Sequence, residues 1–258
     1  MPRPKRLMSN SGYYHLMYRG NNKEFIFAND KMKQIFLDLM QKAAEEEAVE
    51  VAVYCVMNNH IHLIVKSGFE ALSSFSGKLN RKYALRYNST YNRTGHAFED
   101  RFRSEPIDDE TYLLQAARYI HNNPVNAGIK PDPISYRWSS YREYIESNPK
   151  YIKPTQMEFI IDLVGSKERF EDFHKQYDDD VYLDTKEDQE EIMDKKTQRL
   201  IAQFFDNKGI YDYRLLIKSH DLLGELILIL RNEANLSQMK IAKTIGIDAK
   251  TVRNYLND

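Results

Sequence analysis

The sequence predicts an α+β protein followed by a small all-helical domain. Segments prone to β structure, over residues 13–19, 49–57 and 60–66, alternate with segments whose apolar residues follow helical spacing. Two asparagines separate the second and third of these segments, as in an antiparallel hairpin. The last sixty or so residues show helical patterns alone. Together these observations predict an antiparallel sheet with helices packed on it, and then a separate helical domain.

The remaining elements of the first part follow from capping and chain-breaking residues. Asn29 or Asp30 is expected to cap a helix, and residues 69–88 form a second predicted helix, which carries a basic stripe. Residues 98–107 are expected to form an extended edge strand. Asp108 is the expected N-cap of a further helix. That helix should end at about Asn122, because the residue before a proline is pushed out of the helical region.

The distribution of charge divides the chain into three parts. Residues 1–150 carry 21 basic and 17 acidic side chains, whereas residues 151–258 carry 16 and 21. Most of the later deficit lies between Asp178 and Asp194, where nine carboxylates accompany one lysine. We therefore expect a first domain over residues 1–147, an acidic linker with a short helix over 148–195, and a helical domain over 196–258.

Composition excludes several classes of protein. The chain has 258 residues, of which 42% are hydrophobic, so it can bury a core. No apolar run is long enough to cross a bilayer, and none follows the basic N-terminal residues as in a secretory leader. Cys55 is the only cysteine, which excludes an intramolecular disulfide. These features predict a cytoplasmic protein without a membrane partner, and a role on DNA would associate it with the nucleoid.

The first chemical signal is the pair of histidines in the predicted strand over residues 60–66. Side chains alternate along a strand, so His60 and His62 point to the same face. Two imidazoles on a rigid strand provide half of a metal site. Half-exposed strand histidines without a ligand are the alternative, but packing does not call for two imidazoles in such an apolar strand.

The second signal lies on the helix predicted after Asp108. Tyr112, Gln115 and Tyr119 are spaced by three and four residues and share one face, and Asn123 follows Tyr119 by four. A phenol and an amide oxygen beside two imidazoles would provide a nucleophile next to a three-ligand metal. Tyrosines packed in a helix–sheet interface are the alternative, and spacing does not choose between Tyr112 and Tyr119.

Basic residues form a third signal. Arginines and lysines interleaved with aromatic residues suit a groove for a nucleic-acid backbone with stacking surfaces. A solvated helix face is the alternative for the basic stripe on the second helix. The candidates in the first domain are Arg19, Arg81, Lys82, Arg101 and Arg103.

The C-terminal end has the pattern of a helix-turn-helix. Ser237 can cap a short helix, Gly246 provides the turn, and Asp248 opens a second helix. The second helix would present Lys250, Thr251 and Arg253 to the major groove of duplex DNA. A plain packing motif of two helices is the alternative.

Five ordered blocks within residues 1–145 resemble the single-tyrosine HUH transposases, and among them the REP-associated tyrosine transposases. The blocks are MYRGNN (17–22), MNNHIHLIV (57–65), GHAFEDRFRS (95–104), YLLQAARYIHNNPVNAG (112–128) and YRWSSYREY (136–144). The resemblance implies a ferredoxin-like HUH nuclease fold. It also implies that Tyr119 is the nucleophile and that His60 and His62 bind the metal.

The third metal ligand implied by the resemblance is Asn123, at a position that is often glutamine in related enzymes. Gln115, on the same helical face, is the alternative ligand. Tyr112 becomes the second candidate for the nucleophile. The implied cofactor is Mg²⁺ or Mn²⁺, and the implied substrate is single-stranded or hairpin DNA. The implied reaction cleaves and rejoins DNA through a 5′-phosphotyrosine, which conserves the bond energy so that rejoining needs no ATP.

Two further functions remain as alternatives. One is a non-catalytic, sequence-specific DNA-binding regulator on a degenerate nuclease scaffold. The other is a metal-dependent phosphodiesterase that uses an activated water and forms no covalent intermediate. Both a monomer and a homodimer that exchanges the tyrosine helix are compatible with the resemblance.

Overall fold

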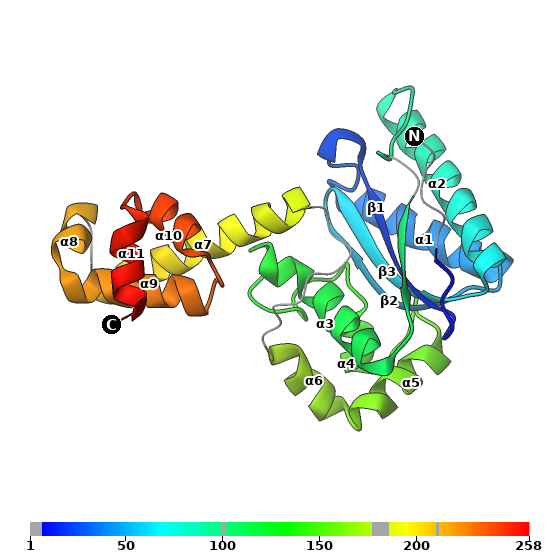
Figure 1. The fold of residues 1–258 in the computed structure, drawn as a ribbon. Helices are drawn as coiled ribbons and strands as arrows, with labels where there is room; N and C mark the ends of the chain where they lie inside the picture. Colours follow the sequence, from blue (N-terminus) through cyan, green and yellow to red (C-terminus); the bar gives the residue numbers. More distant parts are fainter. Residues whose placement is uncertain (1–6, 100–101, 177–185, 210–211, 258) are drawn as a thin grey trace. The chain divides into compact units, whose positions relative to one another are not determined.

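A computed structural model describes residues 7–99, 102–176, 186–209 and 212–257. The chain divides into two compact units, each with its own core. The first unit comprises residues 1–125 and 129–184, and the second comprises residues 126–128 and 185–258. The predicted α+β class is confirmed, since a four-stranded antiparallel sheet is combined with helices (Figure 1).

The sheet of the first unit has the strand order β2-β3-β1-β4, and every neighbouring pair is antiparallel. The expected hairpin joins β2 to β3, and the Met57 amide donates to the His60 carbonyl oxygen at its turn. In the register of β1 and β3, Met17 lies opposite His62 and Arg19 lies opposite His60. The strands are β1 (Tyr13–Arg19), β2 (Glu50–Val56), β3 (His60–Lys66) and β4 (Arg103–Ile107).

Helices cover both faces of this sheet (Figure 1). On one face, α1 (Asp30–Glu46) and α2 (Phe69–Tyr91) pack over the β1 side chains that include Tyr18, whose hydroxyl donates to Ser76 of α2. On the other face lies α3 (Glu110–Asn126). Because alternate strand residues point to opposite faces, His60 and His62 face α3 and not the α1–α2 layer.

Two local expectations about α3 are wrong. The helix runs to Asn126 with Pro124 inside it and does not end at Asn122. Burial of Asn123 and Pro124 against the unit outweighs the local penalty of the proline, and the Pro124 carbonyl oxygen accepts from the Ile129 amide. At the other end, Asp109 accepts from the Tyr112 amide at 2.7 Å, whereas Asp108 binds Ser9 and Asn10.

The segment expected to be an acidic linker with one short helix contains two helices that pack on the first unit. They are α5 (Pro154–Val164) and α6 (Lys167–Lys175), which follow the short α4 (Tyr141–Glu146). Tyr13 of β1 donates a hydrogen bond to Gln156 of α5, which is buried. The acidic composition was an average that Asp178–Asp194 dominates. The apolar residues of α5 and α6 are enough to pack these helices on the unit.

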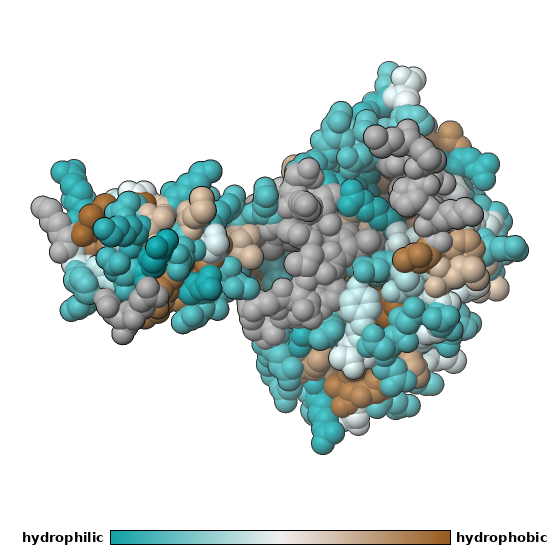
Figure 2. Space-filling view, in the orientation of Figure 1, coloured by the Kyte–Doolittle hydropathy of each residue, from teal (hydrophilic) through white to brown (hydrophobic). Residues whose placement is uncertain are grey.

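The second unit is helical throughout its described residues. Its core combines Leu223, Leu226 and Leu230 of α9 with Ile241 of α10 and Val252 of α11, all of them buried. Charged and polar residues dominate the face of this unit that Figure 2 shows. Its helices are α7 (Lys186–Lys208), α8 (Tyr213–Lys218), α9 (His220–Asn232), α10 (Gln238–Ile245) and α11 (Ala249–Asn257).

Among the helices that the structure describes, none combines the length and the apolar character that crossing a bilayer requires.

Candidate active site

Two imidazoles lie side by side where β3 begins. The ring centroids of His60 and His62 are 5.1 Å apart with the planes at 84°. His62 is fully buried, whereas His60 is half-buried at the end of the strand. Alternation along the strand places both rings on the face that α3 covers. The pair therefore lies between the sheet and the helix that carries the candidate nucleophile.

Tyr119 is the α3 tyrosine that meets this pair. Its ring centroid lies 5.8 Å from that of His62, with the planes at 89°. Tyr112, the other candidate, lies seven residues earlier, about 10 Å back along the helix axis. Spacing alone did not separate the two tyrosines, because both lie on one helical face. The position of α3 along the sheet brings Tyr119 to the histidines.

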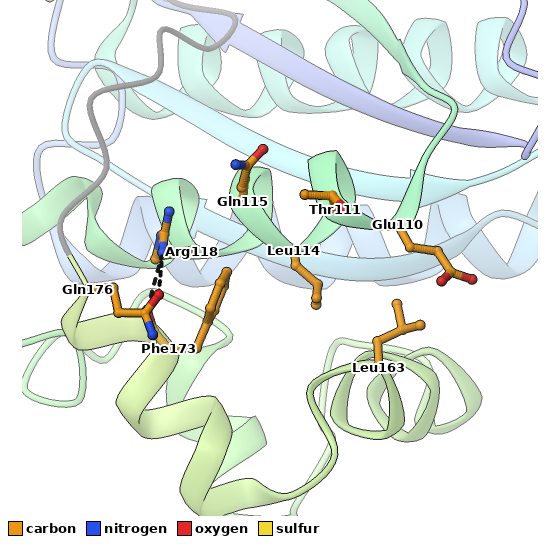
Figure 3. Close-up of a pocket in the computed structure, with 8 residues that line it drawn as sticks. All are labelled: Glu110, Thr111, Leu114, Gln115, Arg118, Leu163, Phe173 and Gln176. Atoms are coloured by element: carbon orange, nitrogen blue, oxygen red, sulfur yellow. Dashed lines mark hydrogen bonds between the residues drawn. The ribbon is translucent and has the colours of Figure 1, made fainter.

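Asn123 follows Tyr119 by one helical turn and is 1% exposed. Its side-chain oxygen and nitrogen have no hydrogen-bond partner among the described residues. A buried amide without partners is costly, about 1–3 kcal/mol, and such a group is retained where it has another use. Gln115, its rival, lines a pocket of about 370 Å³ between α3 and helices α5 and α6 (Figure 3).

His15 is a site residue that sequence reasoning missed. It lies on β1, on the same sheet face as His62, and is fully buried. Its Nε2 is 2.9 Å from Nδ1 of His62, and the two ring centroids are 5.1 Å apart. On the other histidine, Nδ1 of His60 is 2.8 Å from Oδ1 of Asn59. A histidine in a β-prone segment is a weak signal, and only the strand register reveals its neighbour.

These groups have the chemistry of a divalent-cation site. In the described part of the chain, no three His, Cys, Asp or Glu side chains gather as a metal site. The groups that could hold a cation here are the imidazoles of His60 and His62 and the amide oxygen of Asn123. Two nitrogen donors and one oxygen suit Mn²⁺ better than Mg²⁺, which prefers oxygen alone. The amide without partners is the observation that fits such a cation.

The opposite face of α3 is held by a chain of buried hydrogen bonds. His121 lies two residues from Tyr119, and so on the other side of the helix. Its Nδ1 is 2.9 Å from Nε2 of His174 on α6, and its Nε2 is 2.8 Å from Oγ of Ser140. Nδ1 of His174 in turn meets the Phe170 carbonyl oxygen at 2.8 Å. Burial lowers the pKa of His174 to about 4, and it also lowers that of His121.

Further contacts join α6 to α3 beside this chain. The Arg118 guanidinium lies 4.4 Å from the ring centre of Phe173 and donates to Gln176 at 3.4 Å (Figure 3). The Asn122 amide donates to the His174 carbonyl oxygen at 2.8 Å. The tyrosine helix is thus fastened to its own unit from behind, which limits the freedom of Tyr119.

The candidate DNA-binding residues of the first unit do not share one surface. Arg19 and Arg103 lie on the histidine face of the sheet, since the register pairs Arg19 with His60 and Arg103 with Met17. Arg19 is nearly buried, with Nε 3.8 Å from a Glu99 carboxylate oxygen, whereas Arg103 is exposed. Arg101 lies outside the described residues.

The basic stripe on α2 belongs to the layer that covers the other face of the sheet. Arg81 is exposed there. Lys82 is half-exposed and forms an ion pair with Glu46 of α1 at 2.8 Å. The structure therefore does not bring Arg81 and Lys82 together with the histidines.

In the second unit, α10 and α11 flank a turn at Gly246, whose φ of 70° suits glycine. Ser237 accepts from the Lys240 amide, and Asp248 accepts from the Thr251 amide at 2.9 Å. Lys250 and Arg253 are exposed on α11. Thr251 is half-buried, and its hydroxyl binds Asp248.

Residues 8–123 match the family model described as IS200-like transposases. No curated protein was found that matches the sequence. The matched segment contains His60, His62, Tyr119 and Asn123.

Two solved structures are similar. One is the REP-associated tyrosine transposase bound to a REP hairpin, at 13% identity, with 59% of this chain and 91% of that chain covered and a TM-score of 0.46. The other is a protein of Deinococcus radiodurans R1 named as a transposase candidate, at 16% identity, with 47% and 97% covered and a TM-score of 0.34. Over residues 8–123, the chain is similar to the IS200-like transposases.

Proposed function

We propose that this protein is a transposase that cleaves and rejoins single-stranded or hairpin DNA through a covalent 5′-phosphotyrosine at Tyr119, with Mg²⁺ or Mn²⁺ as cofactor. The observation that carries the proposal is the contact of the Tyr119 ring with His62, at 5.8 Å between centroids. It puts a phenol beside two imidazoles in a segment that matches the IS200-like transposases. A nucleophile and a cation site then share one end of the sheet.

His60, His62 and Asn123 would hold the cation. When bound, it neutralises charge on the scissile phosphate and polarises the phosphorus for attack. His62 and Asn123 contribute from buried positions, which restricts competing water molecules. The half-buried His60 leaves the mouth of the site accessible to a phosphate.

Tyr119 performs the transfer. Its phenolic oxygen forms a bond to phosphorus while the bond from phosphorus to the 3′ oxygen breaks. The phenol loses its proton to solvent, and the departing 3′ oxygen takes one up, so no net proton is consumed. Attack of a 3′ hydroxyl on the phosphotyrosine reverses these steps and rejoins the DNA. The hydrogen bonds behind α3 restrict the movement of the helix that carries the phenol.

The DNA backbone would follow the histidine face of the sheet. Arg103 is exposed on the edge strand β4 of this face, where it offers a contact to phosphate. Arg19 is nearly buried beside His60 and would support the phosphate nearest the cation. Arg101, Arg81 and Lys82 would add contacts along a longer strand. In the second unit, Lys250, Thr251 and Arg253 would bind duplex DNA as a recognition helix.

The test is formation of a covalent adduct. The full chain is incubated with 3′-end-labelled hairpin DNA and Mn²⁺ and then denatured, because the fragment that stays on a 5′-phosphotyrosine carries the 3′ end. We expect a labelled protein band that is absent with Tyr119→Phe and retained with Tyr112→Phe, which serves as the matched control on the same helix.

Each other result rejects a part of the proposal. If the adduct is lost in Tyr112→Phe alone, the nucleophile is Tyr112 and not Tyr119. Cleavage without an adduct would indicate a phosphodiesterase that activates water. Binding of DNA that is indifferent to His60→Ala, without any cleavage, would indicate a non-catalytic regulator.

A further inference from the structure

We infer that His15 and Asn59 are positioning residues that hold His62 and His60 in the one tautomer able to bind a cation through Nε2. The inference rests on the proposed function, because it concerns the same cation site. Neither residue would touch the cation or the DNA. Both act through the imidazole next to them.

Asn59 determines the state of His60. The atom that faces Nδ1 of His60, at 2.8 Å, is the Oδ1 of Asn59. An amide oxygen only accepts hydrogen bonds, so Nδ1 of His60 must carry the proton. A neutral imidazole has one protonated nitrogen, and the lone pair of His60 is therefore on Nε2.

His15 has the same place beside His62. Its Nε2 lies 2.9 Å from Nδ1 of His62, and both rings are fully buried. Two neutral imidazoles share one proton in such a bond, so one nitrogen donates and the other accepts. If His15 accepts, His62 carries its proton on Nδ1 and has its lone pair on Nε2. If His15 donates, Nδ1 of His62 accepts the hydrogen bond with its lone pair, and Nε2 of His62 carries the proton.

The first arrangement is the one that matches His60. Both histidines of the pair then present Nε2 lone pairs, with Nδ1 occupied by a second residue. A hydrogen bond to the second ring nitrogen is how proteins orient metal-binding imidazoles. Strand register makes this possible, because His15 is the diagonal neighbour of His62, two residues from its partner Met17.

The experiment measures tautomers and metal affinity in the full chain. Long-range ¹⁵N–¹H correlation spectra of the metal-free protein report which nitrogen of each histidine is protonated. We expect Nδ1 for both His60 and His62. Titration with Mn²⁺ alone, followed by electron paramagnetic resonance, gives the dissociation constant without any need for activity.

The variants separate positioning from packing. His15→Phe keeps a planar ring but accepts no hydrogen bond, and loss of an orienting partner typically weakens metal binding about 10- to 100-fold. His15→Gln restores an acceptor and should stay within about threefold of the natural chain. Asn59→Ala should weaken binding as His15→Phe does. Met17→Leu, directly opposite His62, is the packing control and should leave the Mn²⁺ dissociation constant unchanged.

Two results would overturn the inference. One is a proton on Nε2 of His62 in the metal-free natural chain, which the spectra decide even if His15→Phe does not fold. The other is an unchanged Mn²⁺ dissociation constant in both His15→Phe and Asn59→Ala. If the natural chain binds no Mn²⁺ at all, the proposed function fails, whereas the tautomers are still read from the spectra.

Discussion

The Tyr119 ring stands at 89° to the ring of His62, with the two centroids 5.8 Å apart. The two residues are 57 positions apart in the sequence and come from different layers, one from a strand and one from a helix. Their contact joins a phenol to a pair of imidazoles and so brings together the parts of the proposed cleavage site. It also makes the site sensitive to everything that positions α3 against the sheet.

Removal of either histidine should strongly weaken cation binding. His60→Ala and His62→Ala each remove one of two nitrogen donors, so we expect Mn²⁺ affinity and adduct formation to fall on the order of 100-fold or more. A chelator should abolish adduct formation in the natural chain. Isothermal titration with Mn²⁺ measures the first effect. His96→Ala, at an exposed histidine, is the control and should bind as the natural chain does.

Asn123→Leu should stabilise the metal-free protein while it weakens the cation site. The buried amide lacks hydrogen bonds among the described residues, so an apolar replacement should raise the free energy of unfolding by about 1 kcal/mol. Urea unfolding without metal measures this change, and Mn²⁺ titration should show weaker binding. Asn122→Leu is the matched control, because its amide donates to His174 and its loss should destabilise the protein. Equal destabilisation by both variants would contradict the assignment of Asn123.

Acid should destabilise the first unit through His121 and His174. Burial lowers the pKa of His174 to about 4 and lowers that of His121 in the same direction. Below about pH 6.5 these histidines are therefore protonated in the unfolded chain but stay neutral in the folded one. The free energy of unfolding falls as the pH falls towards 4. The His174 contribution alone amounts to about 3 kcal/mol.

Urea unfolding at several pH values measures this loss. The double variant His121→Leu/His174→Leu should lose most of the slope between pH 6.5 and 4, whatever its absolute stability. His96→Asn, at an exposed histidine, should retain the slope. A natural chain whose stability is constant over this range would contradict the burial of a neutral pair.

Arg103→Ala should weaken binding of hairpin DNA more than Lys82→Ala does. Arg103 is exposed on the histidine face of the sheet, whereas Lys82 is paired with Glu46 in the helical layer of the other face. We expect a loss of about 3- to 10-fold for Arg103→Ala, with a smaller dependence of affinity on salt. Fluorescence anisotropy at several salt concentrations tests this. A larger loss of affinity for Lys82→Ala would indicate that the bound DNA runs mainly over α2.

Arg253→Ala should weaken binding of duplex DNA without any effect on adduct formation. Arg253 is exposed on α11, the helix that we propose recognises duplex DNA. Arg214→Ala is the matched control, since Arg214 is an exposed arginine of α8 in the same unit. If both variants and the natural chain bind duplex DNA with equal affinity, α10 and α11 are a packing motif and not a DNA-binding one.

The sequence determined the features that depend on local periodicity and spacing. Alternation in β3 put His60 and His62 on one face, and helical spacing put Tyr119 and Asn123 on another. The caps at Asn29, Ser237 and Asp248 were also predictable, because each bond closes within three residues.

Only the tertiary structure decided what depends on register and long-range burial. It placed the Tyr119 ring beside His62, placed His15 against His62, and carried α3 through Pro124. It also added α5 to a segment expected to hold one short helix, and it packed α6 behind the tyrosine helix. These outcomes depend on strand register and on the position of each helix along the sheet. Contacts between side chains distant in the sequence supply the free energy that overrides a local preference.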